Sequence, residues 1–405
     1  MNFKGLRVLV LDGYGRQIPS ILKQLHDLEC VVTTVSCSQC DPGYASRYPQ
    51  KRILSAEFKE NNAVMEEVID RELCSGAYDA VIPVLEPSTN FIVKNAEKYG
   101  QFVKIAAAPY EAFIMAYDKE ETLRVCQRIG VPCPLTKMDD ETLEEYLLKV
   151  QFPLALKPRK GTGSIGFHKV ESREELYDLI QSGKVVPEEY VIQEFIPQND
   201  IQYVNYMVID GDGVLKSSLV AEKLRWYPVD GGSASLLRAT DRKDIEQMSL
   251  KLLQAIHWTG YCQVGYINDP RNDTPKILEI NGRIPASIRL CHLCGINVIQ
   301  QMLELAFGEK VTPYMNNTNI GISLRYFQTD VLWLIESKVS FKEKLAWFNF
   351  KKNYDYIFSI RDPWPFFAYT FKGIFRFKKE KKTVRIKFLF LLYFTLQYCI
   401  GFAIH

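Results

Sequence analysis

The chain has 405 residues, of which 47% are hydrophobic and 24% are charged, an ordinary composition for a globular protein. This length allows two or three packed domains and excludes a small scaffold held together by disulfides. Lysine and arginine total 50 against 48 aspartate and glutamate residues, so the net charge of +2 provides no field to attract nucleic acid. We therefore expect no nucleic-acid partner.

The ten cysteines lie largely in apolar stretches, as Cys30 and Cys126 do, which is typical of reduced, buried thiols in a cytosolic protein. Two Cys-x-x-Cys pairs, 37/40 and 291/294, are separated by roughly 250 residues, whereas structural zinc pairs normally lie closer in sequence. Coincidence is therefore favoured over a shared zinc site. The first four residues contain no apolar signal core, so we expect the body of the chain to be cytoplasmic.

The first hundred or so residues alternate predicted strands and helices. Residues 6–11 form a short apolar strand that ends in a turn at Gly13 and Gly15, and a helical pattern follows. Residues 31–35 and 78–84 predict further strands, so parallel crossover units and a small doubly wound domain are expected. The turn could cradle phosphate, but it lacks a third glycine, and a plain strand-to-helix connection is favoured.

The middle of the chain mixes strands with longer helices. Residues 112–130 predict one helix that a glycine and two prolines end. A glycine-rich loop, 160–166, connects two predicted strands, unlike a Walker motif, which leads into a helix. The other expected elements are strands at 152–158, 190–196, 204–209 and 215–221, a helix at 242–258 and a hairpin of 261–267 with 275–280. Gly231-Gly232-Ser233 predicts either a mobile substrate loop or a turn.

Oxygen-bearing side chains occupy alternate positions at the end of the predicted hairpin. Glu279 and Asn281 are two residues apart on a strand and therefore face the same side. Gln263, on the preceding strand, could add a third oxygen, a ligand set that suits Mg²⁺. Arg283 would bring a planar guanidinium to a phosphoryl group or a carboxylate. The alternative is an exposed polar face of a half-buried strand.

Two lysines and the glycine-rich loop could hold a triphosphate. Lys157 ends an apolar strand just before the loop, and Lys119 begins a helix, although either could be a solvated surface lysine. Residues 193–196 form a strand edge that could read an adenine ring, and Asp200 could accept the ribose hydroxyls. A strand that ends in a polar turn would explain the pattern from Gln193 to Asp200 equally well.

The order and rough spacing of these pieces resemble the ATP-grasp superfamily, specifically its carbamoyl-phosphate synthase large-subunit-like and carboxylate–amine ligase branch, D-aspartate ligases included. The resemblance covers about residues 1–310. It implies an α/β fold with four parts: an N-terminal doubly wound domain (1–110), small and large ATP-grasp subdomains (111–200 and 201–310) and a C-terminal accessory region (311–405). Two departures are Gly282, where the family usually has proline, and Asp200, where glutamate is commoner.

The resemblance also implies roles for individual residues, with ATP and one or two Mg²⁺ ions, or Mn²⁺ in their place, as cofactors. The metal ligands would be Gln263, Glu279 and Asn281, and Arg283 would stabilise the transferring phosphoryl group. The nucleotide would be bound by Lys119, Lys157, Gly161, Thr162, Gly163, Ser164, Gln193, Glu194, Phe195, Ile196 and Asp200.

The implied reaction activates a carboxylate as an acyl phosphate and passes the acyl group to an amine, both small molecules. Lys223, Arg225 and Arg289 are candidates for the acyl substrate's own charges, with surface cations or structural ion pairs as the alternative. A catalytically silent ATP-binding module that acts at the membrane face, and a phosphoryl-transfer enzyme that stops at the acyl phosphate, are the competing functions.

Residues 388–404 are uncharged, and the stretch before them, 378–387, is rich in lysine. A run of about 17 apolar residues allows membrane insertion, shallow interfacial burial or a buried helix that closes the last domain. Lysines on the near side would hold that end at the cytoplasmic face and attract anionic lipid. Peripheral or tail-anchored membrane contact through 378–404 therefore stands beside the buried helix, and it would suggest an envelope or capsule precursor as substrate.

Overall fold

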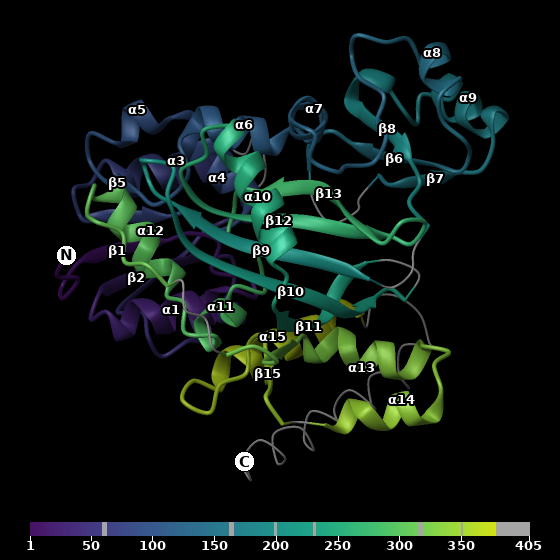
Figure 1. The fold of residues 1–405 in the computed structure, drawn as a ribbon. Coiled ribbons are helices and arrows are strands. Elements are labelled where there is room, and N and C mark those ends of the chain that lie inside the picture. Colours follow the sequence, from purple (N-terminus) through teal and green to yellow (C-terminus); the bar gives the residue numbers. More distant parts are fainter. Residues whose placement is uncertain are drawn as a thin grey trace. The chain divides into compact units, whose positions relative to one another are not determined.

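The structure, a computed structural model, describes residues 1–58, 63–161, 166–197, 201–229, 232–314, 319–349 and 351–377 (Figure 1). The chain separates into two compact units. Unit 1 contains Met1–Ala107, Lys223–Thr240 and the residues from Arg283 onward, and unit 2 contains Ala108–Glu222 and Asp241–Gly282. The domain limits expected from the sequence stay predictions.

Unit 1 begins with a five-stranded parallel sheet of order β3-β2-β1-β4-β5. Its strands are β1 (Arg7–Val10), β2 (Val31–Ser36), β3 (Lys51–Leu54), β4 (Ala80–Ile82) and β5 (Lys104–Ile105). Val8, Leu9 and Val10 are all fully buried, as expected for a strand that helices cover on both faces. The parallel crossover units predicted from the sequence are therefore present.

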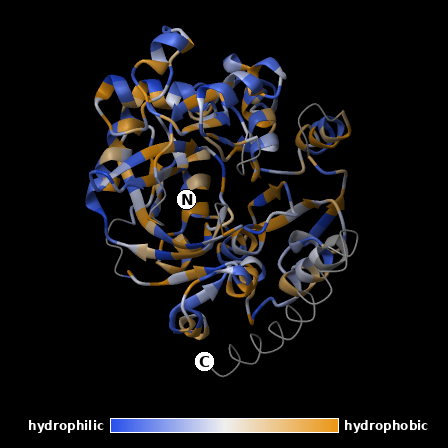
Figure 2. Cartoon of the chain, turned by 90° about the vertical axis from the view of Figure 1, so that its right-hand side faces the viewer, coloured by the Kyte–Doolittle hydropathy of each residue, from blue (hydrophilic) through white to orange (hydrophobic). Residues whose placement is uncertain are grey.

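The helices between these strands bury one apolar face each. In α1 (Ile18–Asp27), Ile18, Ile21, Leu22 and Leu25 are buried while His26 is exposed, and the helices in Figure 2 carry both hydrophobic and hydrophilic residues. The other helices of this part are α2 (Pro42–Ala45), α3 (Ala63–Leu73), α4 (Glu86–Lys94) and α5 (Ala96–Tyr99).

The rest of unit 1 packs around aromatic side chains. The ring of Phe327 lies 6.2 Å from that of Trp347 and 5.9 Å from that of Phe366, centroid to centroid. Strand β11 (Ser233–Thr240) pairs antiparallel with β14 (Ser323–Arg325), which pairs parallel with β15 (Asn353–Asp355). The helices are α11 (Arg289–Leu293), α12 (Val298–Ala306), α13 (Phe327–Glu336), α14 (Phe341–Leu345), the 3-10 helix η2 (Ala346–Phe348) and α15 (Trp364–Phe377).

Unit 2 contains two sheets. The strand order β13-β12-β9-β10 joins β9 (Gln202–Ile209), β10 (Leu215–Tyr227, whose last five residues belong to unit 1), β12 (Gly260–Asp269) and β13 (Thr274–Asn281). The order β7-β6-β8 joins β6 (Leu154–Pro158), β7 (His168–Val170) and β8 (Tyr190–Glu194). The helices of unit 2 are α6 (Tyr110–Tyr117), α7 (Lys119–Ile129), α8 (Leu143–Leu147), α9 (Arg173–Gln181), the 3-10 helix η1 (Pro187–Glu189) and α10 (Lys243–Ala255). Fully buried Trp258 and Ile245 lie in the core of the larger sheet.

One prediction about secondary structure is wrong. The single helix expected over 112–130 is two helices, α6 and α7, because Asp118 has extended backbone angles and its side chain caps α7 by accepting from the Glu120 N–H. The stretch 231–233, expected to be a loop or a turn, leads into β11, which begins at Ser233; Gly231 lies outside the described residues.

Two sequence expectations concern metals and membranes. The described cysteines, Cys37, Cys40, Cys291 and Cys294 among them, are free thiols. Within the described ranges, no helix is long and apolar enough to cross a membrane. The apolar run 388–404, and the lysine-rich stretch before it, lie outside those ranges.

Candidate functional site

The three oxygen-bearing residues of the predicted hairpin come together on one face of the β12–β13 pair. Gln263 and Asn281 are direct partners across the antiparallel ladder, and Glu279 precedes Asn281 by two residues on the same strand. Asn281 Nδ2 donates to Glu279 Oε1 at 3.2 Å, so the Asn281 oxygen is directed away from the carboxylate. Gly265 stands opposite Glu279, where an added Cβ would lie 3.5 Å from Glu279 Cγ. The arrangement gathers one carboxylate and two amides.

Lys157, at the end of β6, lies beside this group. Its ammonium donates to the backbone oxygen of Leu278 at 3.2 Å, one residue before Glu279. Burial lowers the pKa of Lys157 to about 8, although the Glu279 carboxylate acts in the opposite direction. Lys157 and Leu278 are 121 positions apart in the sequence, and the fold brings the Lys157 ammonium next to the strand that bears the oxygen ligands.

Lys119 begins α7 and reaches the start of the glycine-rich loop. Its ammonium donates to the oxygens of Gly161 at 2.7 Å and Arg159 at 3.4 Å. Lys119 is buried, which is unusual for lysine and agrees poorly with a solvated surface residue. Thr162, Gly163 and Ser164, the other loop residues predicted to bind nucleotide, lie outside the described residues, as does Asp200.

The predicted adenine-reading edge lies on β8 and just beyond it. Gln193 is buried, and its Oε1 has no hydrogen-bond partner among the described residues. Ile196 is buried, whereas Phe195 is half-buried with the Lys169 ammonium 4.8 Å from its ring centroid. A buried acceptor without a partner is expected to receive a donor from a ligand or water.

Glu194 does not present its side chain to a ligand, because its carboxylate is already bound. It accepts from Lys276 at 2.7 Å, from Arg271 at 2.6 Å and from the backbone N–H of Leu135 at 2.9 Å. Arg271 and Lys276 also bind Asp269, and hydrogen bonds from Arg271 hold the pKa of Asp269 well below its usual range. This network fixes the end of β8 against the β12–β13 hairpin, so a nucleotide would meet Glu194 through its backbone.

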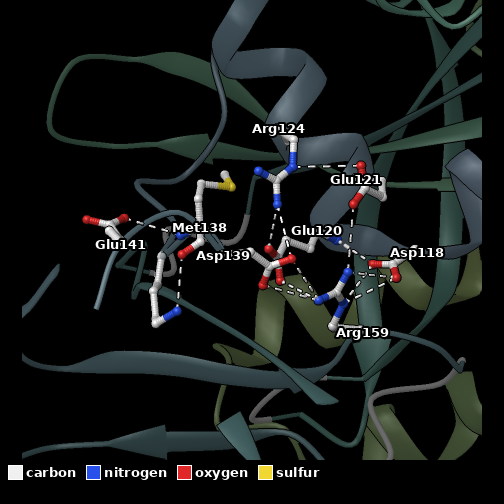
Figure 3. A network of polar contacts seen from close by, with 9 residues as sticks. Asp118, Glu120, Glu121, Arg124, Met138, Asp139, Glu141 and Arg159 are labelled. Carbon is white, nitrogen blue, oxygen red and sulfur yellow. Dashed lines mark hydrogen bonds and ion pairs between the residues drawn. The ribbon is translucent and has the colours of Figure 1, made fainter. Parts of the chain in front are cut away.

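Sequence reasoning missed a second ion-pair network, at the head of α7 (Figure 3). The Arg159 guanidinium lies between Asp118, at 3.0 Å, and Glu120, at 3.1 Å, with Glu121 at 3.8 Å and Asp139 at 3.5 Å. Arg124 binds Glu120 and Asp139 at 3.0 and 3.2 Å. The signal available in the sequence was a cluster of three acids at 118–121 and an arginine beside the glycine-rich loop.

The cations predicted to bind the acyl substrate lie in unit 1. Arg225 is bound to fully buried Asp330 at 3.0 Å and its guanidinium lies 4.3 Å from the Trp333 ring centroid, which supports the structural alternative for this residue. Arg289 donates to the backbone oxygens of Asp355 and Phe358 at 2.7 and 2.5 Å. Lys223 and Arg283 are half-buried.

The residues of unit 2 fit a magnesium–nucleotide ligand. Mg²⁺ prefers oxygen donors and keeps part of its shell for water and phosphate, and Gln263, Glu279 and Asn281 offer three oxygens on adjacent strands. The positive charges of Lys157 and Lys119 are compatible with a triphosphate, and Gln193 has a buried acceptor without a partner among the described residues. No group of three or more histidine, cysteine, aspartate or glutamate residues is placed to hold a metal in the described ranges.

The chain is similar to several known proteins. Residues 229–313 match the family model described as "Carbamoyl-phosphate synthase L chain, ATP binding domain". A D-aspartate ligase of Enterococcus faecium is 27% identical over 229 residues, which cover 52% of this chain and 53% of that protein. The carbamoyl phosphate synthase large chain of Thermomicrobium roseum is 24% identical over 272 residues, 62% of this chain and 24% of that protein. The chain therefore spans about half, or less, of the length of these relatives.

A solved structure extends the comparison to the fold. The biotin carboxylase domain of the Hydrogenobacter thermophilus 2-oxoglutarate carboxylase, solved with MgADP and bicarbonate, has a TM-score of 0.66. It is 13% identical and covers 79% of this chain and 74% of that chain. The fold is that of the ATP-grasp proteins, with mixed α/β content. Within that class, the resemblance to the carbamoyl-phosphate synthase large-subunit-like and carboxylate–amine ligase branch, predicted from the sequence, is confirmed.

Proposed function

We propose that the protein is an ATP- and Mg²⁺-dependent ligase that activates a carboxylate as an acyl phosphate and joins it to an amine. The observation that carries the proposal is the position of Lys157, whose ammonium bonds to Leu278 O, directly before Glu279 on the strand that also bears Asn281. A cation and three oxygen ligands in one place suit a metal-bound triphosphate better than an ordinary polar strand face.

Each residue has a distinct task in this proposal. Gln263, Glu279 and Asn281 hold Mg²⁺, which when bound neutralises charge on the phosphate oxygens. Lys157 and Lys119 bind the phosphates as cations, and Gln193 Oε1 accepts from the amino group of adenine. Arg283, two residues after Asn281 in the chain, stabilises the phosphoryl group as it is transferred.

Phosphorylation makes the carboxylate reactive, because phosphate is a far better leaving group than an oxide. The amine then attacks the acyl carbon, phosphate departs, and no nucleophile from the protein is required. The ligase is favoured over the silent ATP-binding module because the relatives include a D-aspartate ligase and a Halorhodospira halophila protein named "Probable alpha-L-glutamate ligase", the latter 26% identical over 213 residues. Lys223 and Arg289 remain the candidates for charges on the acyl substrate.

An ADP-release screen over amino acids and small carboxylates tests this function, with Glu279→Ala as the blank. We expect release that requires both an acid and an amine and that the blank lacks. Labelled carboxylate oxygen identifies the chemistry: one label passes into phosphate if an acyl phosphate forms and is displaced. Label retained entirely in the product would exclude the acyl phosphate, and ADP release without any amine product would favour the phosphoryl-transfer alternative.

We also propose that the C-terminal part contacts the cytoplasmic face of a membrane, through 378–404 and through α14. Phe341 and Leu345 are four positions apart on α14 and remain 77% and 53% exposed. Residues 338–352 contain five lysines and one glutamate, so the segment around these two apolar side chains has a net positive charge. Positive charge beside exposed apolar side chains favours binding to anionic lipid.

Flotation of the full chain with vesicles tests the membrane proposal. We expect binding to vesicles that contain phosphatidylglycerol, weaker binding to phosphatidylcholine alone, and several-fold weaker binding for Phe341→Ala/Leu345→Ala. Leu148→Ala is the control, because Leu148 is an even more exposed leucine (84%) and lies in unit 2. Equal binding by the double variant and the control would remove α14 from the contact.

A further inference from the structure

Arg159 occupies a special position in the chain of unit 2. It lies two residues after Lys157 and two residues before Gly161, so it connects the strand that bears one phosphate-binding lysine to the glycine-rich loop. Its side chain is largely buried, at 17% exposure, and points to the head of α7, where Figure 3 shows it surrounded by carboxylates. A guanidinium with five donors can bind several carboxylates at once.

Arg159 binds Asp118 through two of its nitrogens. Nε donates to Asp118 Oδ1 at 3.1 Å and Nη2 donates to Oδ2 at 3.0 Å, the paired geometry that makes arginine–carboxylate contacts strong. Asp118 also caps α7, since its side chain accepts from the Glu120 N–H. Arg159 is thus bound to the residue that fixes where α7 begins.

The backbone of Arg159 is bound to the same helix start. Its oxygen accepts from the Lys119 N–H at 3.0 Å and from the Lys119 ammonium at 3.4 Å, while its own N–H donates to Glu189 O at 2.8 Å. The Lys119 ammonium continues to Gly161 O at 2.7 Å. The side chain and backbone of Arg159 therefore hold Lys119 and Gly161 in one fixed arrangement.

We propose that Arg159 is a positioning residue for nucleotide binding: by binding Asp118 and the start of α7, it holds Lys119, together with Gly161, in place for the triphosphate. The inference rests on the proposed function, because it needs the site to bind nucleotide. In this proposal Arg159 does not bind phosphate itself; it acts through Lys119 and through the backbone of Gly161. Geometry of this kind matters because phosphate-binding groups lose much of their effect when displaced by about 1 Å.

Arg124 provides a matched comparison within the same network. It binds Glu120, Glu121 and Asp139, three of the carboxylates that Arg159 also binds, but it projects from the middle of α7 rather than from the loop. If Arg159 only neutralises the acidic cluster, Arg124→Gln and Arg159→Gln should have equal effects. If Arg159 positions Lys119 and Gly161, the two variants should differ in nucleotide affinity.

Titration with MgADP measures the difference, with the melting temperature of the ligand-free protein recorded for each variant. We expect Arg159→Gln to weaken MgADP binding by about tenfold or more, Arg124→Gln by less than about twofold, and Arg159→Lys to recover part of the loss. Equal affinities for the two glutamine variants would overturn the proposal. An absence of MgADP binding by the unaltered protein would instead contradict the proposed function.

A second pair of variants covers the case in which Arg159→Gln does not fold. Asp118→Asn keeps an oxygen to cap α7 but removes the charge that Arg159 binds, whereas Asp139→Asn removes a charge that both arginines share at the surface. We expect weaker MgADP binding for Asp118→Asn and near-normal binding for Asp139→Asn. The reverse order, or no difference, would show that the network contributes stability alone.

Discussion

Asn281 lies directly across the antiparallel ladder from Gln263, and its Nδ2 donates to the Glu279 carboxylate at 3.2 Å. Asn281 therefore lies beside both of the other proposed metal ligands, and its amide stabilises the negative charge of the Glu279 carboxylate. Asn281→Asp would replace this donor with a second carboxylate, and like charges so close repel strongly without a cation.

We expect Asn281→Asp to lower the stability of the metal-free protein by about 1–3 kcal/mol, since a hydrogen bond is lost and a repulsion gained. Added Mg²⁺ should restore much of this loss, because the cation pairs both carboxylates. Thermal unfolding with and without MgCl₂ measures both effects. Asn272→Asp, on the exposed turn between the same strands, is the control and should show no such response to Mg²⁺.

Lys157→Met is expected to abolish most nucleotide binding while the protein stays folded. The substitution removes the cation beside Glu279 and, because Lys157 is partly buried and burial already lowers its pKa to about 8, it removes a desolvation cost as well. Affinity for MgADP should fall by about tenfold to a hundredfold, because a hydrogen bond between charged groups contributes about 1.5–3 kcal/mol. Lys149→Met, an exposed lysine paired with Glu141, should bind normally.

The raised pKa of Glu120 predicts a specific dependence of folding stability on pH. Burial and a hydrogen bond with Asp139 raise its pKa to about 7, although Arg159 and Arg124 oppose the shift. The folded state therefore holds a proton that the unfolded chain releases near pH 4.5, and this contribution to stability is present at low pH and lost as pH rises through about 7.

Denaturant unfolding between about pH 5 and 7.5 should consequently show a smaller fall in stability for Glu120→Gln than for the unaltered protein. The difference in slope has an upper limit of about 1.4 kcal/mol per pH unit for one proton. Glu121→Gln, one position along the same turn, is the comparison and should retain the original slope. Parallel curves for all three proteins would show that Glu120 does not carry the proton.

The glycine at position 282, where ATP-grasp proteins usually have proline, has a physical explanation in this chain. A Cβ at this position would lie 2.9 Å from Trp258 Cη2 and 3.0 Å from Phe113 Cδ2, and both rings are fully buried. Neither ring can move easily, so Gly282→Ala should cost about 1–3 kcal/mol of stability and displace Asn281, its neighbour in the chain. Chemical denaturation checks the cost. Gly211→Ala, where a Cβ meets nothing within 4 Å, should be close to neutral.

Sequence reasoning predicted the arrangement of Glu279, Asn281 and Gln263 because it depends on two local rules, the alternation of side chains along a strand and the pairing of a hairpin. The single helix over 112–130 was wrong because apolar spacing continues across Asp118, whose capping geometry ends one helix and starts another. The contacts of Arg225 could not be predicted, since its partner Asp330 lies 105 residues away in the sequence. Buried ion pairs of this kind depend on the tertiary fold alone.

The most direct test of the central claim is calorimetric titration of ADP into the full chain with and without Mg²⁺, for the unaltered protein and for Glu279→Ala. If Gln263, Glu279 and Asn281 hold the metal against the phosphates beside Lys157, Mg²⁺ should strengthen ADP binding by the unaltered protein at least about tenfold, and Glu279→Ala should lose that gain while remaining folded. A Mg²⁺-dependent gain that survives unchanged in Glu279→Ala would contradict the metal assignment and the ligase function built on it.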